Sequence, residues 1–282
     1  FKKVVVADNC ALFVNGVFEN YQTLDGSTLF LGAFFFTIQI YGDFSGYSDI
    51  AIGCARLFGI DLMQNFKYPY FSRDIAEFWR RWHISLTTWF RDYIYIPLGG
   101  SRAGKWKSFR NTLVIFLVSG FWHGANWTFV AWGAYHALLF LPLLLLGQNR
   151  RYRDSVAENS FLPSVKELTQ MGATFLLVLL GWILFRSEDI SQAAVYLERM
   201  FNVSLFSAPQ LVGLGFGQLL LKKCFFFTAL MFVVEWIGRK QAHGLMIEDL
   251  SLPVRYVIYT VLLIIIYGFD ASNPQGFIYF QF

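Results

Sequence analysis

Long uncharged, apolar runs alternate along this chain with short polar stretches. Residues 111–149 contain no Asp, Glu, Lys or Arg, and neither do residues 168–185 or 200–221. A helix needs about 20 predominantly apolar residues to cross a bilayer, so the first run is long enough for two spans. The chain has 282 residues, of which 56% are hydrophobic and only 15% charged, well below the share of a soluble domain. The pattern therefore predicts an all-α, multi-span integral membrane protein.

The apolar runs also predict where the elements lie. We expect a helix over 1–24, an apolar helix over 27–42 that breaks at Asp43–Asp49 and resumes over 50–60, two spans within 111–147, and further spans at 168–185, 203–221, 224–238 and 254–269. A second break is expected near Ser119 and Gly120, because irregular backbone at membrane depth can line a cavity. The aromatic tail over 277–282 suits a membrane interface. With no linker in sight, residues 1–282 are predicted to belong to one membrane domain.

The stretch between Asp61 and Arg110 is too polar to span. It has four acidic residues against nine basic ones, which are Lys67, Arg73, Arg80, Arg81, Arg91, Arg102, Lys105, Lys107 and Arg110. Trp and Tyr alternate with these cations, as in segments at a bilayer surface. The positive charge predicts a cytoplasmic connection, made of interfacial or re-entrant helices, that meets anionic lipid headgroups or an anionic substrate. This placement beside apolar spans argues against nucleic-acid binding.

Four histidines are the candidates for proton transfer. His123 lies in Phe121–Trp127, inside the longest uncharged run, where an ionisable group is costly and indicates function. An imidazole can accept a proton from an alcohol near neutral pH, and Asn126 can hydrogen-bond in a dry site. A histidine that only bonds a neighbouring helix is the alternative. Taken alone, His83 suits an interfacial residue, His136 a structural one and His243 a solvated one.

Other chemistries have little support. Asp43 and Asp49, six residues apart, do not share a helical face and suit caps or turns, although a proton relay stays open. The chain has no P-loop, no Gly-x-Ser-x-Gly and no His-Glu-x-x-His motif. Its three cysteines lack the spacing of a zinc site, so we expect no bound metal and no bound cofactor.

Three long motifs resemble the membrane-bound O-acyltransferase (MBOAT) family. They are Tyr41–Gly53, Phe78–Gly100 and Phe121–Trp127, and the aromatic ending over 277–282 is similar too. The match runs over essentially the whole chain and is most similar to the bacterial polysaccharide O-acetylase branch, including alginate O-acetylation. The resemblance implies a helical bundle with a central tunnel. It also implies that about 200 residues of N-terminal spans are missing, so that 1–282 is the C-terminal part of the domain.

The resemblance also assigns roles to residues. His123 matches the family's essential histidine, and His83 lies at the spacing of its second polar partner. The implied enzyme is an O-acyltransferase of the bacterial cytoplasmic (inner) membrane, which moves an acetyl group from acetyl-CoA or an acyl carrier thioester toward an exported polysaccharide. We expect Arg80, Arg81 and Arg91 to hold donor phosphates, and Trp122 and Asn126 to contact substrate. Expected partners are membrane lipid, an SGNH-like periplasmic acetyltransferase and exopolysaccharide assembly proteins.

Three alternatives stay open at this point. D-alanyl transfer to a teichoic acid-type acceptor would use the same site. A transporter would use Asp43, Asp49 and the histidines as a proton relay, and a scaffold would need none of them.

Overall fold

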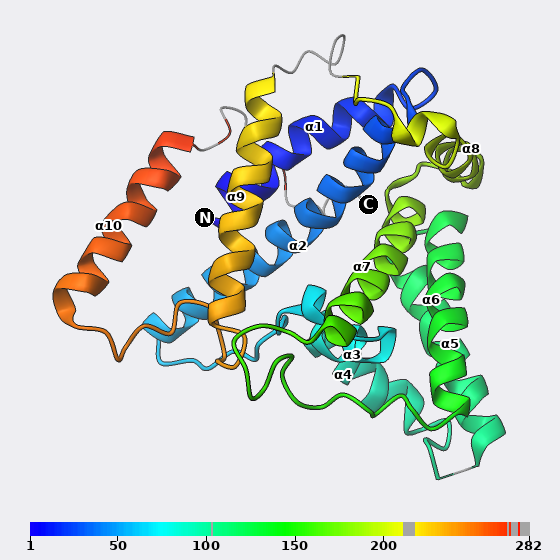
Figure 1. The fold of residues 1–282 in the computed structure, drawn as a ribbon. Coiled ribbons are helices and arrows are strands. Elements are labelled where there is room, and N and C mark those ends of the chain that lie inside the picture. The colour runs from blue at the N-terminus through cyan, green and yellow to red at the C-terminus, as the bar shows by residue number, and fades with distance from the viewer. Residues whose placement is uncertain (103, 211–217, 270, 272–275, 277–282) are drawn as a thin grey trace. The chain divides into compact units, whose positions relative to one another are not determined.

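The computed structural model of the protein describes residues 1–282 apart from 103, 211–217, 270, 272–275 and 277–282. Over these described residues the ordered elements are all helical and none is a strand, which confirms the all-α class (Figure 1). Three described helices are long and apolar enough to cross a membrane: α6 (Trp127–Leu145), α7 (Val165–Arg186) and α10 (Leu252–Phe269). No residue of α10 is buried, as expected of a helix that faces lipid.

The chain divides into two compact units. Unit 1 combines Phe1–Leu62 with Ala194–Phe282, and unit 2 is Met63–Ala193. Besides α10, unit 1 holds the π-helical segment η1 (Lys2–Ala7), α1 (Asp8–Glu19), α2 (Gly26–Leu57), the 3-10 turn η4 (Val203–Phe206) and α9 (Gln218–Ile237). Besides α6 and α7, unit 2 holds η2 (Pro69–Phe71), α3 (Ile75–Arg81), α4 (Ile84–Phe90), η3 (Arg91–Tyr95) and α5 (Lys105–His123). Helix α8 (Ile190–Met200) contains the division, and membership of one membrane domain stays a prediction.

Helix α2 of unit 1 is unbroken, so the break predicted at Asp43–Asp49 is wrong. The two carboxylates are paired with lysines of η1 instead: Lys3 Nζ lies 2.9 Å from Asp43 and Lys2 Nζ 3.1 Å from Asp49. Gly46 lets the two backbones approach, since a Cβ there would lie 2.8 Å from the Lys3 nitrogen. Because the negative charges are neutralised by a neighbouring element, the helix continues without an irregular turn.

The later part of unit 1 also differs from the predicted spans. The span expected over 203–221 is wrong over residues 203–210, because Val203–Phe206 is a short 3-10 turn and residues 207–210 are not helical, whereas residues 218–221 begin α9. Lys222 and Lys223 do not separate two helices but lie inside α9. The aromatic tail over 277–282 lies outside the described residues.

In unit 2, α5 and α6 pack closely through two glycines. A Cβ on Gly120 would lie 2.3 Å from the Phe129 carbonyl oxygen, and one on Gly133 would lie 2.3 Å from that of Phe116. The break predicted near Ser119 and Gly120 is therefore wrong, since Gly120 serves a close helix contact, and α5 continues to His123. The chain then turns at once into α6, so the end of α5 lies beside the start of α6 (Figure 1).

Helix α7 completes the core of unit 2. Trp132 of α6 stacks on Trp182 of α7 with ring centroids 5.8 Å apart, and the Tyr135 hydroxyl donates to the Leu177 carbonyl. A capping box of Ser164 and Glu167 satisfies the first amides of α7. The described polar residues between 61 and 104 form only short helices, and residues 105–110 begin α5. The place of the short helices at the membrane surface, like the central tunnel, stays a prediction.

Candidate active site

The turn between α3 and α4 is anchored by a buried tryptophan. The Trp82 ring packs against Phe66 and Trp182, with centroids 5.0 Å away in each case, and stacks on Phe78 at 5.4 Å. Large aromatic contacts of this kind contribute both burial and a defined geometry. The residue that follows Trp82, His83, is thereby held at a fixed place beside α7.

His83 has a left-handed backbone conformation, with φ 44° and ψ 56°. This region is sparsely populated by residues other than glycine, although Asn, Asp and His tolerate it better than most. The conformation ends α3 and starts α4, and it persists because the Ile84 amide donates to the Asn65 carbonyl at 3.0 Å. Burial lowers the pKa of His83 to about 4, so its imidazole is neutral near pH 7.

His123 is the last residue of α5 and lies in an aromatic surround. Its ring meets Trp132 edge-on at 5.2 Å and Phe185 at 5.0 Å, and these come from α6 and α7. Trp122 connects it with His83, since the Trp122 ring centroid is 5.0 Å from that of His123 and 6.3 Å from that of His83. Both imidazoles therefore contact the same indole ring. The structure thus brings together His83, Trp122 and His123 from distant parts of the sequence.

Asn126 and the two remaining histidines make other contacts. Asn126 caps α6: its side-chain oxygen accepts from the Thr128 amide at 3.0 Å, and its NH2 group donates to the Glu188 carbonyl. His136 is fully buried in the core of unit 2, between Trp79 and Trp132. His243 is exposed in unit 1, in agreement with its prediction as a solvated residue.

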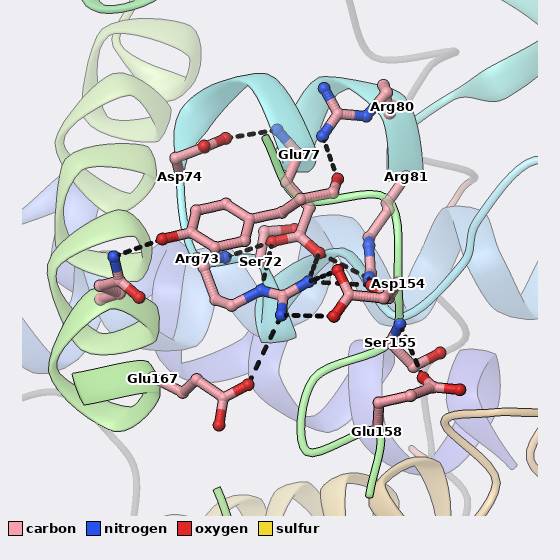
Figure 2. A network of polar contacts seen from close by, with 12 residues as sticks. Ser72, Arg73, Asp74, Glu77, Arg80, Arg81, Asp154, Ser155, Glu158 and Glu167 are labelled. Atoms are coloured by element: carbon pink, nitrogen blue, oxygen red, sulfur yellow. Dashed lines mark hydrogen bonds and ion pairs between the residues drawn. The ribbon is translucent and has the colours of Figure 1, made fainter. Parts of the chain in front are cut away.

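Three charged residues at helical spacing make a buried ion network that the sequence analysis did not single out. The Glu77 side chain, 1% exposed, accepts from Arg73 Nη2 at 2.9 Å and from Arg81 Nη2 at 2.6 Å (Figure 2). Arg73 also reaches Asp154 at 3.1 Å and Glu167 at 3.5 Å. The alternation of sign at positions 73, 77 and 81 is the signal in the sequence that could have revealed it.

The network fastens the loop between α6 and α7 onto α3. Arg73 and Arg81 both donate to the Asp154 carbonyl, and Arg80 donates to the carbonyls of Asn149 and Tyr152. Although partial burial opposes it, the hydrogen bond from Arg73 keeps the pKa of Asp154 below its usual value. Four backbone or carboxylate groups of one loop are therefore held by arginines of one short helix and its preceding turn.

This arrangement forms a cationic pocket of about 370 Å³ in unit 2. Its lining residues are Lys67, Arg80, Arg81, Arg150, Tyr152, Arg153, Asp154 and Ser155. Five cations therefore surround one carboxylate, which suits a ligand with several negative charges. Of the arginines predicted to hold phosphates, Arg80 and Arg81 line this pocket. Arg91 is not among its lining residues and pairs with its neighbour Asp92 at 2.7 Å.

The described residues include no cluster of three or more His, Cys, Asp or Glu side chains that could hold a metal ion. Fold and site together define a helical membrane protein in which two imidazoles contact one tryptophan ring within an aromatic surround. The chain belongs to the membrane-bound O-acyltransferase family, whose family model matches residues 15–158 and so includes both His83 and His123. This confirms the family predicted from the three motifs.

Several curated relatives are similar to the chain over most of its length. It is 41% identical to the probable alginate O-acetylase AlgI of Pseudomonas aeruginosa, over 78% of this chain and 41% of that protein. It is 38% identical to a peptidoglycan O-acetyltransferase of Helicobacter pylori, over 72% of this chain and 37% of the relative. A teichoic acid D-alanyltransferase of Bacillus subtilis is 30% identical over 54% of this chain and 40% of the relative. The chain thus spans about two fifths of the length of these relatives.

The Glu77 network makes a prediction about stability. Glu77→Gln leaves the buried guanidinium groups of Arg73 and Arg81 without their shared counter-charge, which costs about 3–5 kcal/mol. We expect a clear fall in the thermal unfolding midpoint of the purified protein in detergent. The matched control is Asp92→Asn, which removes the carboxylate of the exposed pair with Arg91 and should leave the midpoint unchanged. Equal midpoints for both variants would show that the network does not hold this unit together.

Proposed function

We propose that the protein is a membrane-bound O-acyltransferase that moves an acetyl group from a cytoplasmic thioester donor toward an exported polysaccharide such as alginate. The observation that supports this most strongly is the convergence of His83, Trp122 and His123 in a chain that belongs to this family. The relatives named for O-acetylation match more of the chain than the relative named for D-alanyl transfer does. We place the protein in the bacterial cytoplasmic membrane, with several spans.

In the proposed reaction His123 is the general base. Its neutral imidazole accepts the proton of the acceptor hydroxyl while the hydroxyl oxygen attacks the thioester carbonyl carbon. The carbon–sulfur bond then breaks, and the departing thiolate takes the proton back from the imidazolium. The rings of Trp122, Trp132 and Phe185 around His123 limit the access of water, which protects the thioester from hydrolysis. Asn126 donates one N–H to the Glu188 carbonyl, and its second N–H donates to the thioester oxyanion in this proposal.

The donor is acetyl-CoA or an acyl carrier thioester, and its phosphates occupy the cationic pocket. Arg80 and Arg81 shape that pocket, while Lys67, Arg150 and Arg153 supply further positive charge. Arg91, on the surface beside Asp92, is proposed to serve the approach of the donor rather than its final position. On the far side of the membrane, an SGNH-like periplasmic acetyltransferase takes the acetyl group and passes it to the polysaccharide within an exopolysaccharide assembly.

The direct test is transfer of labelled acetyl groups from acetyl-CoA in vesicles that hold the full-length protein. We expect His123→Ala to reduce the rate by about 10²- to 10⁴-fold while the protein stays folded and inserted, because the general base is lost. His243→Ala, at an exposed histidine of unit 1, should keep the wild-type rate. Full activity of the His123 variant would contradict the proposal. A protein that transports solute without ever forming a labelled product would support the transporter, and a D-alanyl product would support that branch.

The pocket makes a separate prediction about the donor. Arg153→Glu should raise KM for acetyl-CoA by about 10- to 100-fold with little change in kcat, because it replaces an attraction for phosphate by a repulsion. KM for acetyl-pantetheine, which lacks the phosphates, should not change. Arg102→Glu, at an exposed arginine that does not line the pocket, is the matched control. An unchanged KM for acetyl-CoA, or an equal rise for both donors, would show that the pocket does not hold phosphates.

A further inference from the structure

A short chain of hydrogen bonds at the α3–α4 turn joins Asn65, Ser85 and His83. Ser85, in the first turn of α4, lies with its Oγ 2.5 Å from Asn65 Oδ1 and 3.4 Å from Nδ1 of His83. The Ser85 amide also donates to Asn65 Oδ1, at 3.2 Å. Asn65 therefore holds Ser85 by both its backbone and its hydroxyl, and Ser85 in turn lies against one ring nitrogen of His83.

The order of donors and acceptors in this chain follows from Asn65. The atom of Asn65 that faces the Ser85 amide must be an acceptor, so it is the carbonyl oxygen of the carboxamide. That oxygen cannot donate, and the hydroxyl of Ser85 therefore gives its single proton to Asn65. Only lone pairs of Ser85 Oγ are then left for His83. A favourable contact requires the proton of the neutral imidazole to lie on Nδ1.

Backbone hydrogen bonds around the α3–α4 turn keep Asn65 next to Ser85 and His83. The Ile84 amide donates to the Asn65 carbonyl at 3.0 Å, and the Lys67 amide donates to the Arg81 carbonyl at 3.0 Å. Residues 65–67 thus run alongside the turn and fix Asn65 against it. The left-handed backbone of His83 is set by the same bonds, so the ring and its partner cannot easily move apart.

We propose that Asn65 and Ser85 are positioning residues that hold His83 in the tautomer protonated on Nδ1, so that Nε2 carries a lone pair and acts as a proton or hydrogen-bond acceptor. This inference rests on the proposed acyl transfer. The low pKa of His83 agrees with it, because a neutral ring has only one N–H to place. Because Nε2 then carries no proton, it cannot donate a hydrogen bond to the thioester oxyanion, for which Asn126 is the proposed donor. Its Nε2 lone pair is instead left to accept a hydrogen bond or a proton from the reacting groups.

The first test is spectroscopic and uses the full-length protein in nanodiscs with ¹⁵N-labelled histidine. The His83 signals are assigned by their loss in His83→Gln. We expect the wild type to show a protonated Nδ1 and an unprotonated Nε2 for His83. Ser85→Ala should shift the population toward the Nε2-protonated tautomer, and Ser85→Thr, which keeps the hydroxyl, should not. A wild-type ring protonated on Nε2, or a tautomer that does not respond to Ser85→Ala, would overturn the proposal.

The second test is kinetic and separates positioning from folding. Ser85→Ala should lower kcat for acetyl transfer by about 10- to 100-fold with KM for the donor unchanged, and Ser85→Thr should restore it. Asn65→Asp keeps an acceptor for the Ser85 proton and should retain the tautomer, whereas Asn65→Ala should lose it. Thr88→Ala, at another hydroxyl of α4 outside this chain of bonds, is the control and should keep the wild-type kcat.

The outcomes also separate this inference from the proposed function. If His83→Gln keeps full acetyl transfer, His83 has no part in the reaction and the proposed site fails at that residue. If His83→Gln is inactive but Ser85→Ala keeps both tautomer and kcat, the site stands and the positioning role is wrong.

Discussion

The structure of unit 2 depends on one buried carboxylate. Glu77 lies between two guanidinium groups from positions four residues before and four residues after it, and it is almost fully excluded from solvent. Each arginine also binds the loop between α6 and α7, so the network joins a seven-residue helix to a loop some 75 residues later. A helix this short has little stability of its own, so α3 is stabilised by the ion network and by the packing of Trp82. His83 lies two residues after Arg81, so the ion network and Trp82 fix its position.

The two halves of the candidate site are built by different means. His83 is held by hydrogen bonds and ion pairs at a turn between short helices, while His123 ends a long helix and is held by aromatic rings of α6 and α7. Glycine contacts between α5 and α6 set where that helix ends relative to its neighbours. Trp122 connects the hydrogen-bonded turn that holds His83 with the aromatic contacts that hold His123, because its ring contacts both imidazoles. Such support from rigid elements is what proton transfer between fixed groups requires.

Hydropathy was enough to predict the helical class and the spans at α6, α7 and α10, because long apolar helices leave a signal in composition alone. Sequence pattern gave wrong predictions where the same residue type can either break a helix or make a close contact within one. Gly120 marks one predicted helix break and Gly46 lies within the other, but each glycine permits a close approach by another segment, which only the partner's position reveals. Asp43 and Asp49 looked like residues of an irregular turn, because the local sequence does not show that they pair with lysines some 40 residues away. The pairing of His83 with His123 came from the family resemblance, whereas Asn65, Ser85 and the cations of the loop near Arg153 could be related to the site only in three dimensions.

The central claim is that His83 and His123 act as one unit. A double-mutant cycle on acetyl transfer, with His83→Gln, His123→Ala and the combined variant of the full-length protein, tests it most directly. Residues that act together give strongly non-additive effects, so we expect the combined variant to be about as slow as the slower single variant. If the two losses multiply instead, the imidazoles contribute independently and the account of a single coupled site is wrong.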